Sequence, residues 1–252
     1  MKHKIKPLIG KPDATILTVN HEKVSKIPDT IYELNGQLEE LHLTGNKLNN
    51  CDPVGHLSSL KRLYISNNKL TCVPQLQALN RLTHLILSYN RIESFPQGIT
   101  SCGNLKHLDL SGNRMKEIPE KVSMLQSLKA LYICNNLIEQ FQVAICEIKG
   151  LQVLSVRSND LTALPDALGQ MHKLKRFYAQ DNRLQYLPET IVQCPWEVFG
   201  SVVKLTKNPL VPTFQKAYGE RGIRGIFPLY RQGKYESIKA EAKPVDKLKK
   251  KK

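Results

Sequence analysis

The sequence predicts an α/β fold of the solenoid type, with a curved parallel sheet on the concave face and short helices or irregular segments on the convex face. The first observation behind this prediction is a repeated pattern, L-x-x-L-x-L-x-x-N-x-L, of which the chain holds eight copies. The second is their spacing, because the seven clear copies begin 22 or 23 residues apart. One strand-containing unit per copy, stacked on the next unit, explains a period in this range.

The clear copies keep the same internal offsets throughout. Their first leucines are Leu38, Leu60, Leu82, Leu105, Leu128, Leu151 and Leu174, and their asparagines are Asn46, Asn68, Asn90, Asn113, Asn136, Asn159 and Asn182. A looser eighth copy contains Val203, Leu205, Asn208 and Leu210. A degenerate unit precedes them all, with Leu17, Val19, Val24 and Ile27 in place but Glu22 where the asparagine should be.

Each part of the pattern predicts a structural role. Leu108 and Leu110 are two residues apart, so both point to one face of a strand. Asn113 follows at the turn, and stacking places such amides in a buried ladder that satisfies backbone groups. The next apolar-proline step, Ile118-Pro119, suits an irregular crossing because proline fixes φ and has no N–H to donate. No unit buries its apolar face alone, so neighbouring units must stack.

The period and the pattern are typical of leucine-rich repeats. The chain resembles the intracellular leucine-rich-repeat proteins of the Ras-suppressor/Shoc2-like class, on the 23-residue period and on segments such as "LKHLDLSGNRMKEIPEKVSML". The resemblance covers residues 14–211. It implies partners in signalling or adhesion assemblies, such as small GTPases, phosphatases or LIM-type adaptors. It also implies a helical cap after Asn208-Pro209-Leu210, although Pro228 departs from a continuous helix and predicts a short helix followed by a turn.

We expect one solenoid domain with a short extension at each end. Residues 1–13 form a basic arm, residues 14–211 the solenoid, residues 212–232 a C-terminal cap and residues 233–252 a flexible lysine-rich tail. Most of the net charge of +15 lies in the end segments, because residues 203–252 hold 14 Lys and Arg against 4 Asp and Glu. The unit that begins at Leu174 is 26 residues long, and we interpret Trp196 within it as a packing residue.

Cysteine usage and hydropathy indicate the kind of cellular compartment in which the protein is expected. The six cysteines lie singly within the repeats, without the cysteine-rich caps of secreted leucine-rich-repeat proteins, and no Asn-x-Ser/Thr sequon occurs. The sequence has no apolar run long enough for a signal peptide or a membrane span. These features favour a reducing compartment. We therefore expect a cytoplasmic protein, with nuclear and mitochondrial locations as open alternatives.

The positions that flank the strand leucines should project from the concave face and form columns across the units. Basic residues gather along one edge of these columns and tyrosines stand along the middle. Tyrosine and arginine are common anchors of protein interfaces. A basic edge beside them suits an acidic or phosphorylated partner. The residues that we expect to bind a partner are Arg62, Tyr64, Tyr89, Tyr132, Lys175, Arg176 and Tyr178.

The function that these features favour is a non-catalytic scaffold, a monomer that joins a hetero-complex. One alternative is a structural subunit of a ribonucleoprotein or other large assembly, anchored by the basic tails, through which nucleic acid could bind. Basic residues interleaved with aromatic residues can also track nucleic acid. Another is a substrate-recognition adaptor whose second docking surface would lie at 209–235. A catalytic or metal site built from His84, His107, Asp109 and Cys134 is disfavoured, because an open sheet has no wall to exclude water. We expect no catalytic residue, cofactor or metal.

Overall fold

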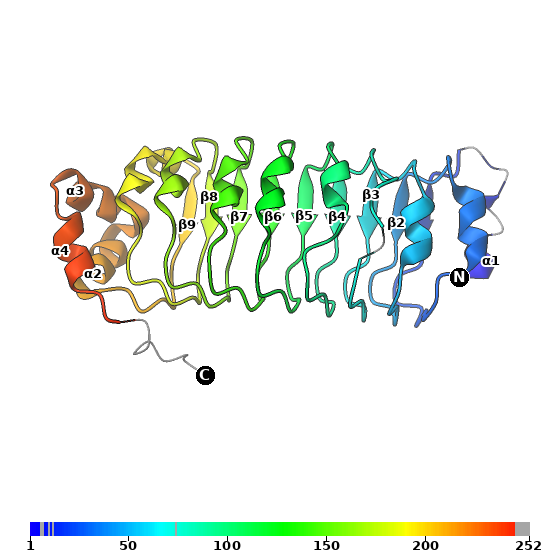
Figure 1. The fold of residues 1–252 in the computed structure, drawn as a ribbon, viewed down its shortest axis with the longest axis horizontal. Helices are drawn as coiled ribbons and strands as arrows, with labels where there is room; N and C mark the ends of the chain where they lie inside the picture. Colours follow the sequence, from blue (N-terminus) through cyan, green and yellow to red (C-terminus); the bar gives the residue numbers. More distant parts are fainter. Residues whose placement is uncertain (6–7, 10, 12, 74, 245–252) are drawn as a thin grey trace.

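The computed structural model describes residues 1–5, 8–9, 11, 13–73 and 75–244. Within them, one parallel sheet runs the length of the molecule, with nine three-residue strands in chain order (Figure 1). The strands are β1 (Ile16–Thr18), β2 (Glu40–His42), β3 (Arg62–Tyr64), β4 (His84–Ile86), β5 (His107–Asp109), β6 (Ala130–Tyr132), β7 (Val153–Ser155), β8 (Arg176–Tyr178) and β9 (Val202–Lys204). The predicted α/β solenoid is therefore confirmed.

Short 3-10 helices cover the side of the sheet that faces away from the partner surface predicted above. They are η2 (Asp29–Leu34), η3 (Asp52–His56), η4 (Ile99–Ser101), η5 (Glu120–Met124), η6 (Val143–Glu147), η7 (Asp166–Gln170), η8 (Glu189–Gln193) and η9 (Pro195–Glu197). Pro119, Pro165 and Pro188 each stand at the N-cap of one of these helices, in extended conformation. A proline at this point ends the extended crossing without leaving an N–H group unpaired.

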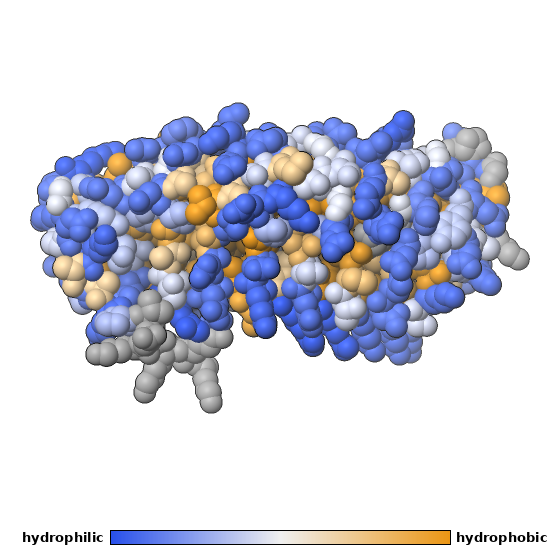
Figure 2. All heavy atoms as spheres, viewed as in Figure 1, coloured by the Kyte–Doolittle hydropathy of each residue, from blue (hydrophilic) through white to orange (hydrophobic). Residues whose placement is uncertain are grey.

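The central residue of every strand points into a continuous core. Leu131 of β6 has no exposed surface, and it lies in register with Leu108 of β5 and Leu154 of β7. Residues on either side of the central position project away from the core, because side chains alternate along a strand. The register expected from the leucine spacing is thus the one observed. The face shown in Figure 2 has hydrophobic residues over its middle and hydrophilic residues along its edges.

The asparagine ladder is also confirmed. The buried amide of Asn113 donates to the carbonyl oxygens of Leu87, at 3.1 Å, and Leu110, at 2.9 Å. Its Oδ1 accepts the N–H of Ile92 at 3.0 Å. Asn113 therefore satisfies backbone groups of its own unit and of the preceding unit. Equivalent bonds are made by Asn68, Asn90, Asn136, Asn159, Asn182 and Asn208.

The residue before each asparagine of the ladder is in the left-handed region of backbone space. Gly45 and Gly112 occupy two of these positions, and Tyr89, with φ of 56°, occupies a third. A left-handed conformation costs little for glycine but is unusual for an aromatic residue. Backbone bonds between neighbouring units continue past the strands as far as this turn, where the N–H of Gly112 donates to the carbonyl of Cys134 at 2.8 Å.

The two ends of the solenoid are covered differently. At the N-terminal end, α1 (Lys2–Ile5) lies beside the first unit (Figure 1), and the side-chain amide of Gln37 donates to the carbonyl oxygens of Leu8, at 3.1 Å, and Ala14, at 2.9 Å. At the C-terminal end, the hydroxyl of Tyr218 accepts the N–H of Leu205 at 3.0 Å and donates to the Val203 carbonyl at 3.2 Å. Tyr218 therefore satisfies backbone groups around the last strand.

The C-terminal end carries α2 (Pro212–Arg221), η10 (Gly222–Gly225), α3 (Ile226–Arg231) and α4 (Tyr235–Ala240). Pro228 lies in the first turn of α3, where its missing N–H leaves no helical bond unmade. The helix α4 falls within 233–252, the segment expected to be a flexible tail, and its Ile238 is buried. The side-chain amide of Gln185 also exchanges two hydrogen bonds with the backbone of Lys243, at 2.8 and 2.7 Å. Residues 245–252 of that segment lie outside the described residues.

Candidate interaction surface

The sheet presents one side to solvent along the whole solenoid, and we call it the strand face. It consists of the first and last residue of each strand together with the residue that precedes the strand. On β6 these positions hold Lys129, Ala130 and Tyr132, on either side of buried Leu131. Equal positions on neighbouring strands are in register, so each position forms a column of side chains about 4.8 Å apart.

The first four units of the strand face are neutralised by their own ion pairs. Lys61 Nζ lies 2.6 Å from a carboxylate oxygen of Glu39. Arg62 pairs in the same way with Glu40 in the next column. Both pairs join β2 to β3 between equal positions of adjacent units. A partner that needs these cations would have to displace the carboxylates.

The last five units differ, because their cations have no such partners. Lys106, Lys129, Lys175, Arg176 and Lys204 are exposed, and the structure gives none of them an ion pair within the described part of the chain. Asp109 is the carboxylate that this part of the strand face contributes, and it accepts the N–H of Ser111 at 2.9 Å. We call the strand face of β5 to β9 the basic half.

Aromatic rings stack along the strand face. The ring of His42 lies parallel to that of Tyr64, with centroids 4.5 Å apart. Further along, His107 stacks on His84 at 5.6 Å and on Tyr132 at 5.1 Å. Each contact joins adjacent strands, so the strand spacing itself produces the stacking. The rings hold one another in place, which lowers the entropy lost when they contact a partner.

Burial favours the uncharged forms of His84, His107 and Tyr132. Desolvation lowers the pKa of His84, with a further contribution from His107. Desolvation also lowers the pKa of His107, against the opposing effect of Asp109. Burial raises the pKa of the Tyr132 phenol, with smaller contributions from Tyr178 and Asp109. The positive charge of the basic half therefore comes from its lysines and Arg176.

Small side chains separate the two tyrosines of the basic half. Tyr132, Ser155 and Tyr178 occupy the same position on β6, β7 and β8. Ser155 is buried, and its hydroxyl lies 2.9 Å from the sulfur of Cys134. The adjacent Ala130 is buried as well. The tyrosine rings therefore stand on either side of a strand whose outward side chains are smaller than they are.

The structure brings together some of the residues expected to bind a partner. Tyr132, Lys175, Arg176 and Tyr178 lie on or next to β6 and β8 in the basic half. Arg62 and Tyr64 lie on β3, among the neutralised units. Tyr89 is in the turn after β4 rather than on a strand, and its side chain is 57% exposed. A Cβ at Gly112 would lie 2.7 Å from this ring, so the ring rests on the glycine of the next unit.

The division of the strand face into a neutralised part and a basic half was not predicted, although the sequence holds a signal for it. Glu39 and Lys61 are neighbours in one column, and Glu40 and Arg62 are neighbours in the next. Opposite charges at equal positions of adjacent strands pair. The charges at equal positions of adjacent units therefore predict both ion pairs.

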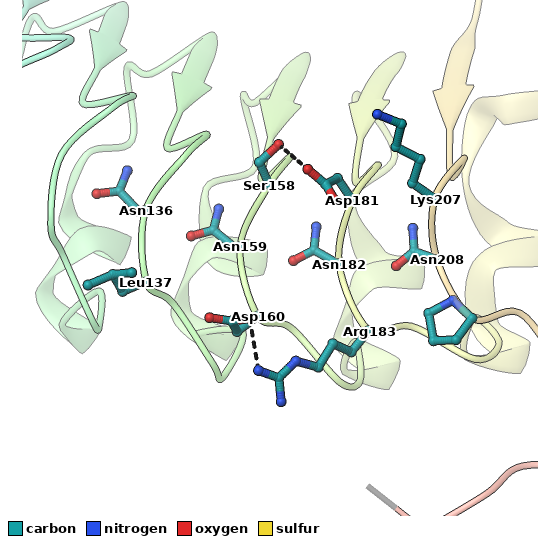
Figure 3. Close-up of a pocket in the computed structure, with 11 residues that line it drawn as sticks. Asn136, Leu137, Ser158, Asn159, Asp160, Asp181, Asn182, Arg183, Lys207 and Asn208 are labelled. Atoms are coloured by element: carbon teal, nitrogen blue, oxygen red, sulfur yellow. Dashed lines mark hydrogen bonds and ion pairs between the residues drawn. The ribbon is translucent and has the colours of Figure 1, made fainter. Parts of the chain in front are cut away.

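A pocket of about 270 Å³ opens at the turn edge of the last units (Figure 3). Its walls hold an Arg183–Asp160 ion pair of 2.9 Å and a Ser158–Asp181 hydrogen bond of 2.9 Å. Four of the lining residues belong to the asparagine ladder: Asn136, Asn159, Asn182 and Asn208. Their amides donate to backbone carbonyls of the repeat, so these four side chains have a structural role in the pocket wall.

The histidines and the cysteine considered for catalysis do not assemble a site in the described residues. His84 and His107 stack face to face, and the sulfur of Cys134 contacts Ser155 rather than an imidazole. No group of three His, Cys, Asp or Glu side chains in the described ranges is placed to hold a metal ion. Over the same ranges, no helix has the length and apolar character to cross a membrane.

Stacked strand–turn–helix units joined by a buried asparagine ladder define a solenoid repeat protein. The leucine-rich repeat family model matches residues 37–92, 80–138 and 103–161. This part of the chain belongs to the leucine-rich repeat family, and the structure continues the same unit on both sides of it. Comparison with curated protein sequences gave no match.

Solved structures with the same fold come from bacteria and plants. A leucine-rich-repeat protein of Leptospira interrogans is 29% identical, with a TM-score of 0.65 over 81% of this chain and 57% of that protein. InlJ of Listeria monocytogenes is 23% identical, with a TM-score of 0.66 over 78% of this chain and 40% of that one. The ectodomain of the receptor kinase GASSHO1/SCHENGEN3 of Arabidopsis thaliana is 24% identical, with a TM-score of 0.60 over 81% of this chain and 28% of that one. The last two show the fold alone, and the chain spans about half or less of these proteins.

Proposed function

We propose that the protein is a non-catalytic interaction scaffold whose basic half binds an acidic or phosphorylated segment of a protein partner. The observation that carries this proposal is the juxtaposition of five cations without ion pairs and two partly exposed tyrosines, Tyr132 and Tyr178, on one rigid sheet. Lysine and arginine side chains bind carboxylates and phosphates, and tyrosine supplies apolar contact with little loss of entropy.

The dimensions of the basic half fit an extended segment. Five strands spaced about 4.8 Å apart span about 19 Å, which is the length of about six residues in extended conformation. A segment that runs across the strands would meet Lys106, Lys129, Lys175 and Lys204 in turn. Acidic residues spread along such a segment would find one cation on most strands, with the tyrosines as apolar anchors between them.

The structural neighbours support a role in binding. The structure of GASSHO1/SCHENGEN3 is of a complex with CASPARIAN STRIP INTEGRITY FACTOR 2, and that of the plant peptide hormone receptor RGFR1 is of a complex with RGF2. The same repeat therefore serves in those proteins to hold another molecule. Each of them is longer than this chain, and the identity of the partner does not carry over.

The setting that we propose is intracellular, with a role in signalling. Its support is the set of six unpaired cysteines, of which Cys51, Cys102, Cys146 and Cys194 are buried within single repeats. Membership of the Ras-suppressor/Shoc2-like class is part of the same proposal, on the 23-residue period and the apolar-proline step. Within its complex we propose that the protein is a monomer, because the cap covers the last strand and thereby discourages end-to-end stacking.

Two other functions remain as alternatives. Tyrosines among cations also suit single-stranded nucleic acid, which would make the protein a subunit of a ribonucleoprotein and give its binding a steep dependence on salt. An adaptor that presents a substrate to an enzyme would need a second docking surface, for which the cap is the candidate. We favour the protein scaffold because the cations of the neutralised units are held by carboxylates rather than aligned for a continuous phosphate backbone.

A charge-reversal pair tests the proposal. Arg176→Glu and Arg62→Glu change the same column of the strand face, one in the basic half and one in the neutralised part. Proteins captured from lysate by the tagged full-length chain are compared by mass spectrometry. We expect Arg176→Glu to lose partners that Arg62→Glu retains. Equal capture by both variants would contradict the assignment of the basic half.

A further inference from the structure

The loop between η9 and β9 exposes apolar side chains to a degree found nowhere else among the described residues. Phe199 is 96% exposed and the preceding Val198 is 58% exposed. Phe199 exceeds every other large hydrophobic residue of the described chain in exposure, whereas Val198 is less exposed than Met124, at 62%. We call these two residues the Val198–Phe199 tip. An exposed phenylalanine beside an exposed valine has no polar group with which to meet water, so the tip is a candidate contact site.

The tip projects because the terminal unit is longer than the others. The preceding clear repeats begin 22 or 23 residues apart, whereas Leu174 and the matching Gly200 are 26 residues apart. Extra residues in one repeat form a loop on its surface, often at a binding face. Gly200 has a φ of 86°, a left-handed conformation that lets the chain turn back into β9 directly after the tip.

The base of the loop is fixed, so the tip cannot fold into the core. The ring of Trp196 is buried and lies parallel to that of Phe177, with centroids 5.4 Å apart. Its indole nitrogen donates to the Leu174 carbonyl at 2.9 Å. The hydroxyl of Ser201 donates to the Pro195 carbonyl at 2.7 Å, which closes the base of the loop. The aromatic position in the core is taken by Trp196, and Phe199 is held outside it.

The C-terminal end of the described chain carries an excess of positive charge. The segment η10 lies against η9, and exposed Arg221 and Arg224 stand at the end of α2 and within η10. The one acidic residue of η9, Glu197, is ion-paired with Arg231 at 2.6 Å. Residues 203–244, from β9 to the end of the described chain, hold nine Lys and Arg against three Glu. The C-terminal end of the solenoid therefore combines the exposed Val198–Phe199 tip with an excess of cations.

We propose that this end of the solenoid docks on the surface of an anionic lipid bilayer. Val198 and Phe199 enter the boundary between headgroups and acyl chains, while Arg221, Arg224 and the lysines of the cap meet lipid phosphates. Apolar insertion and electrostatic attraction are each weak alone and become effective together. The tip consists of two adjacent exposed residues, which suits a fluid bilayer, since a bilayer needs no complementary shape. A protein pocket would bury a larger continuous patch around the anchor.

Vesicle sedimentation tests the docking site with the full-length chain. We expect binding to vesicles that contain phosphatidylserine in phosphatidylcholine, and little binding to phosphatidylcholine alone. Phe199→Ala should lower the partition coefficient by about tenfold, because a buried phenylalanine contributes that much to apolar transfer. Met124→Ala, on η5, is the matched control and should bind as the unchanged protein does. Equal binding by Phe199→Ala and Met124→Ala, or no preference for phosphatidylserine, would overturn the proposal.

A fluorescence readout separates insertion from adsorption by charge. Phe199→Trp adds an exposed tryptophan to the buried Trp196, the single tryptophan of the chain. Its emission should shift to shorter wavelength with phosphatidylserine vesicles and be quenched by brominated lipid. An emission that vesicles leave unchanged, but that shifts when a captured protein partner is added, would replace the bilayer with a protein pocket as the occupant.

Discussion

The ring of Tyr132 lies against the imidazole of His107, with centroids 5.1 Å apart and an angle of 28° between the planes. The contact joins β5 to β6 at the start of the basic half. It holds the phenol ring at a fixed position on the strand face while leaving part of it exposed. A partly exposed aromatic residue that is already ordered is the kind of residue that dominates binding energy at protein interfaces.

Tyr132→Ala should therefore weaken binding of the protein partner by more than about 1 kcal/mol without unfolding the chain. Titration calorimetry on the captured partner measures the change, and circular dichroism checks the fold. Tyr32→Ala is the control, because Tyr32 is also exposed but lies on η2, away from the strand face. An affinity that survives Tyr132→Ala would remove this part of the strand face from the interface.

The core register leads to a second prediction. Leu131 has no exposed surface and lies between Leu108 and Leu154 in the sheet. Leu131→Ala should lower the free energy of unfolding by about 2–5 kcal/mol, because it removes buried methyl groups and leaves a cavity. Urea denaturation gives the value. Leu137→Ala, at a residue that is 44% exposed, should change stability by about 0.5 kcal/mol or less. Similar losses for both variants would contradict the register.

The asparagine ladder leads to a third prediction, which concerns stability. Asn113→Ala would leave the buried N–H of Ile92 without its acceptor, while the carbonyl of Leu87 would keep the amide of Asn90 at 3.0 Å as its donor. An unpaired buried N–H costs about 1–3 kcal/mol, so we expect a marked drop in the melting temperature. Asn80→Ala removes an exposed asparagine from the turn before β4 and should have little effect. A normal melting temperature for Asn113→Ala would show that water can replace the ladder.

The fourth prediction concerns pH. Burial lowers the pKa of His107 below its ordinary value of 6.5, and His84, Tyr132 and Asp109 are the titratable groups beside it. The unfolded chain therefore binds a proton more readily than the folded one, so stability present above 6.5 is lost as the pH falls through that value toward the folded pKa. The urea concentration at the denaturation midpoint should decrease as the pH is lowered from about 7.5 to about 5.5, roughly the window of this titration.

The variant His107→Gln isolates that contribution. It should show a smaller fall in the denaturation midpoint over the same pH range, because the group that titrates has been removed. His172→Gln, at an exposed turn residue, serves as the matched substitution. An unchanged pH dependence in His107→Gln would mean that other groups govern acid sensitivity. Nuclear magnetic resonance of the imidazole protons gives the pKa of His107 directly and should place it below 6.5.

The solenoid was predictable because its rule is local and repeated. Leu131 and Asn113 each recur at a fixed offset, and only a stack of units satisfies both the apolar side chain and the amide. The candidate surface was only partly predictable. The columns placed Tyr132 and Tyr178 on the strand face, but the neutralisation of Arg62 depends on a carboxylate 22 residues earlier in the sequence, on the adjacent strand.

Two further features depend on how particular residues fit rather than on the repeat. The ring of Tyr89 lies on Gly112 because its own turn is left-handed, and the residue pattern gives no sign of where that ring points. In the terminal unit, Trp196 is buried against Phe177, whereas Phe199 is exposed. The 26-residue spacing marked the unit as irregular, but not which of the two rings would be buried.

Site-specific photo-crosslinking tests the central claim, that the basic half of the strand face holds a protein partner, most directly. Benzoylphenylalanine is placed at Tyr132 or Tyr178 in one set of proteins and at Tyr32 in another, and irradiated lysates are treated with nuclease before analysis. We predict protein adducts from positions 132 and 178, and none from position 32. Adducts confined to position 32, or adducts from the strand face that disappear with nuclease, would contradict the account.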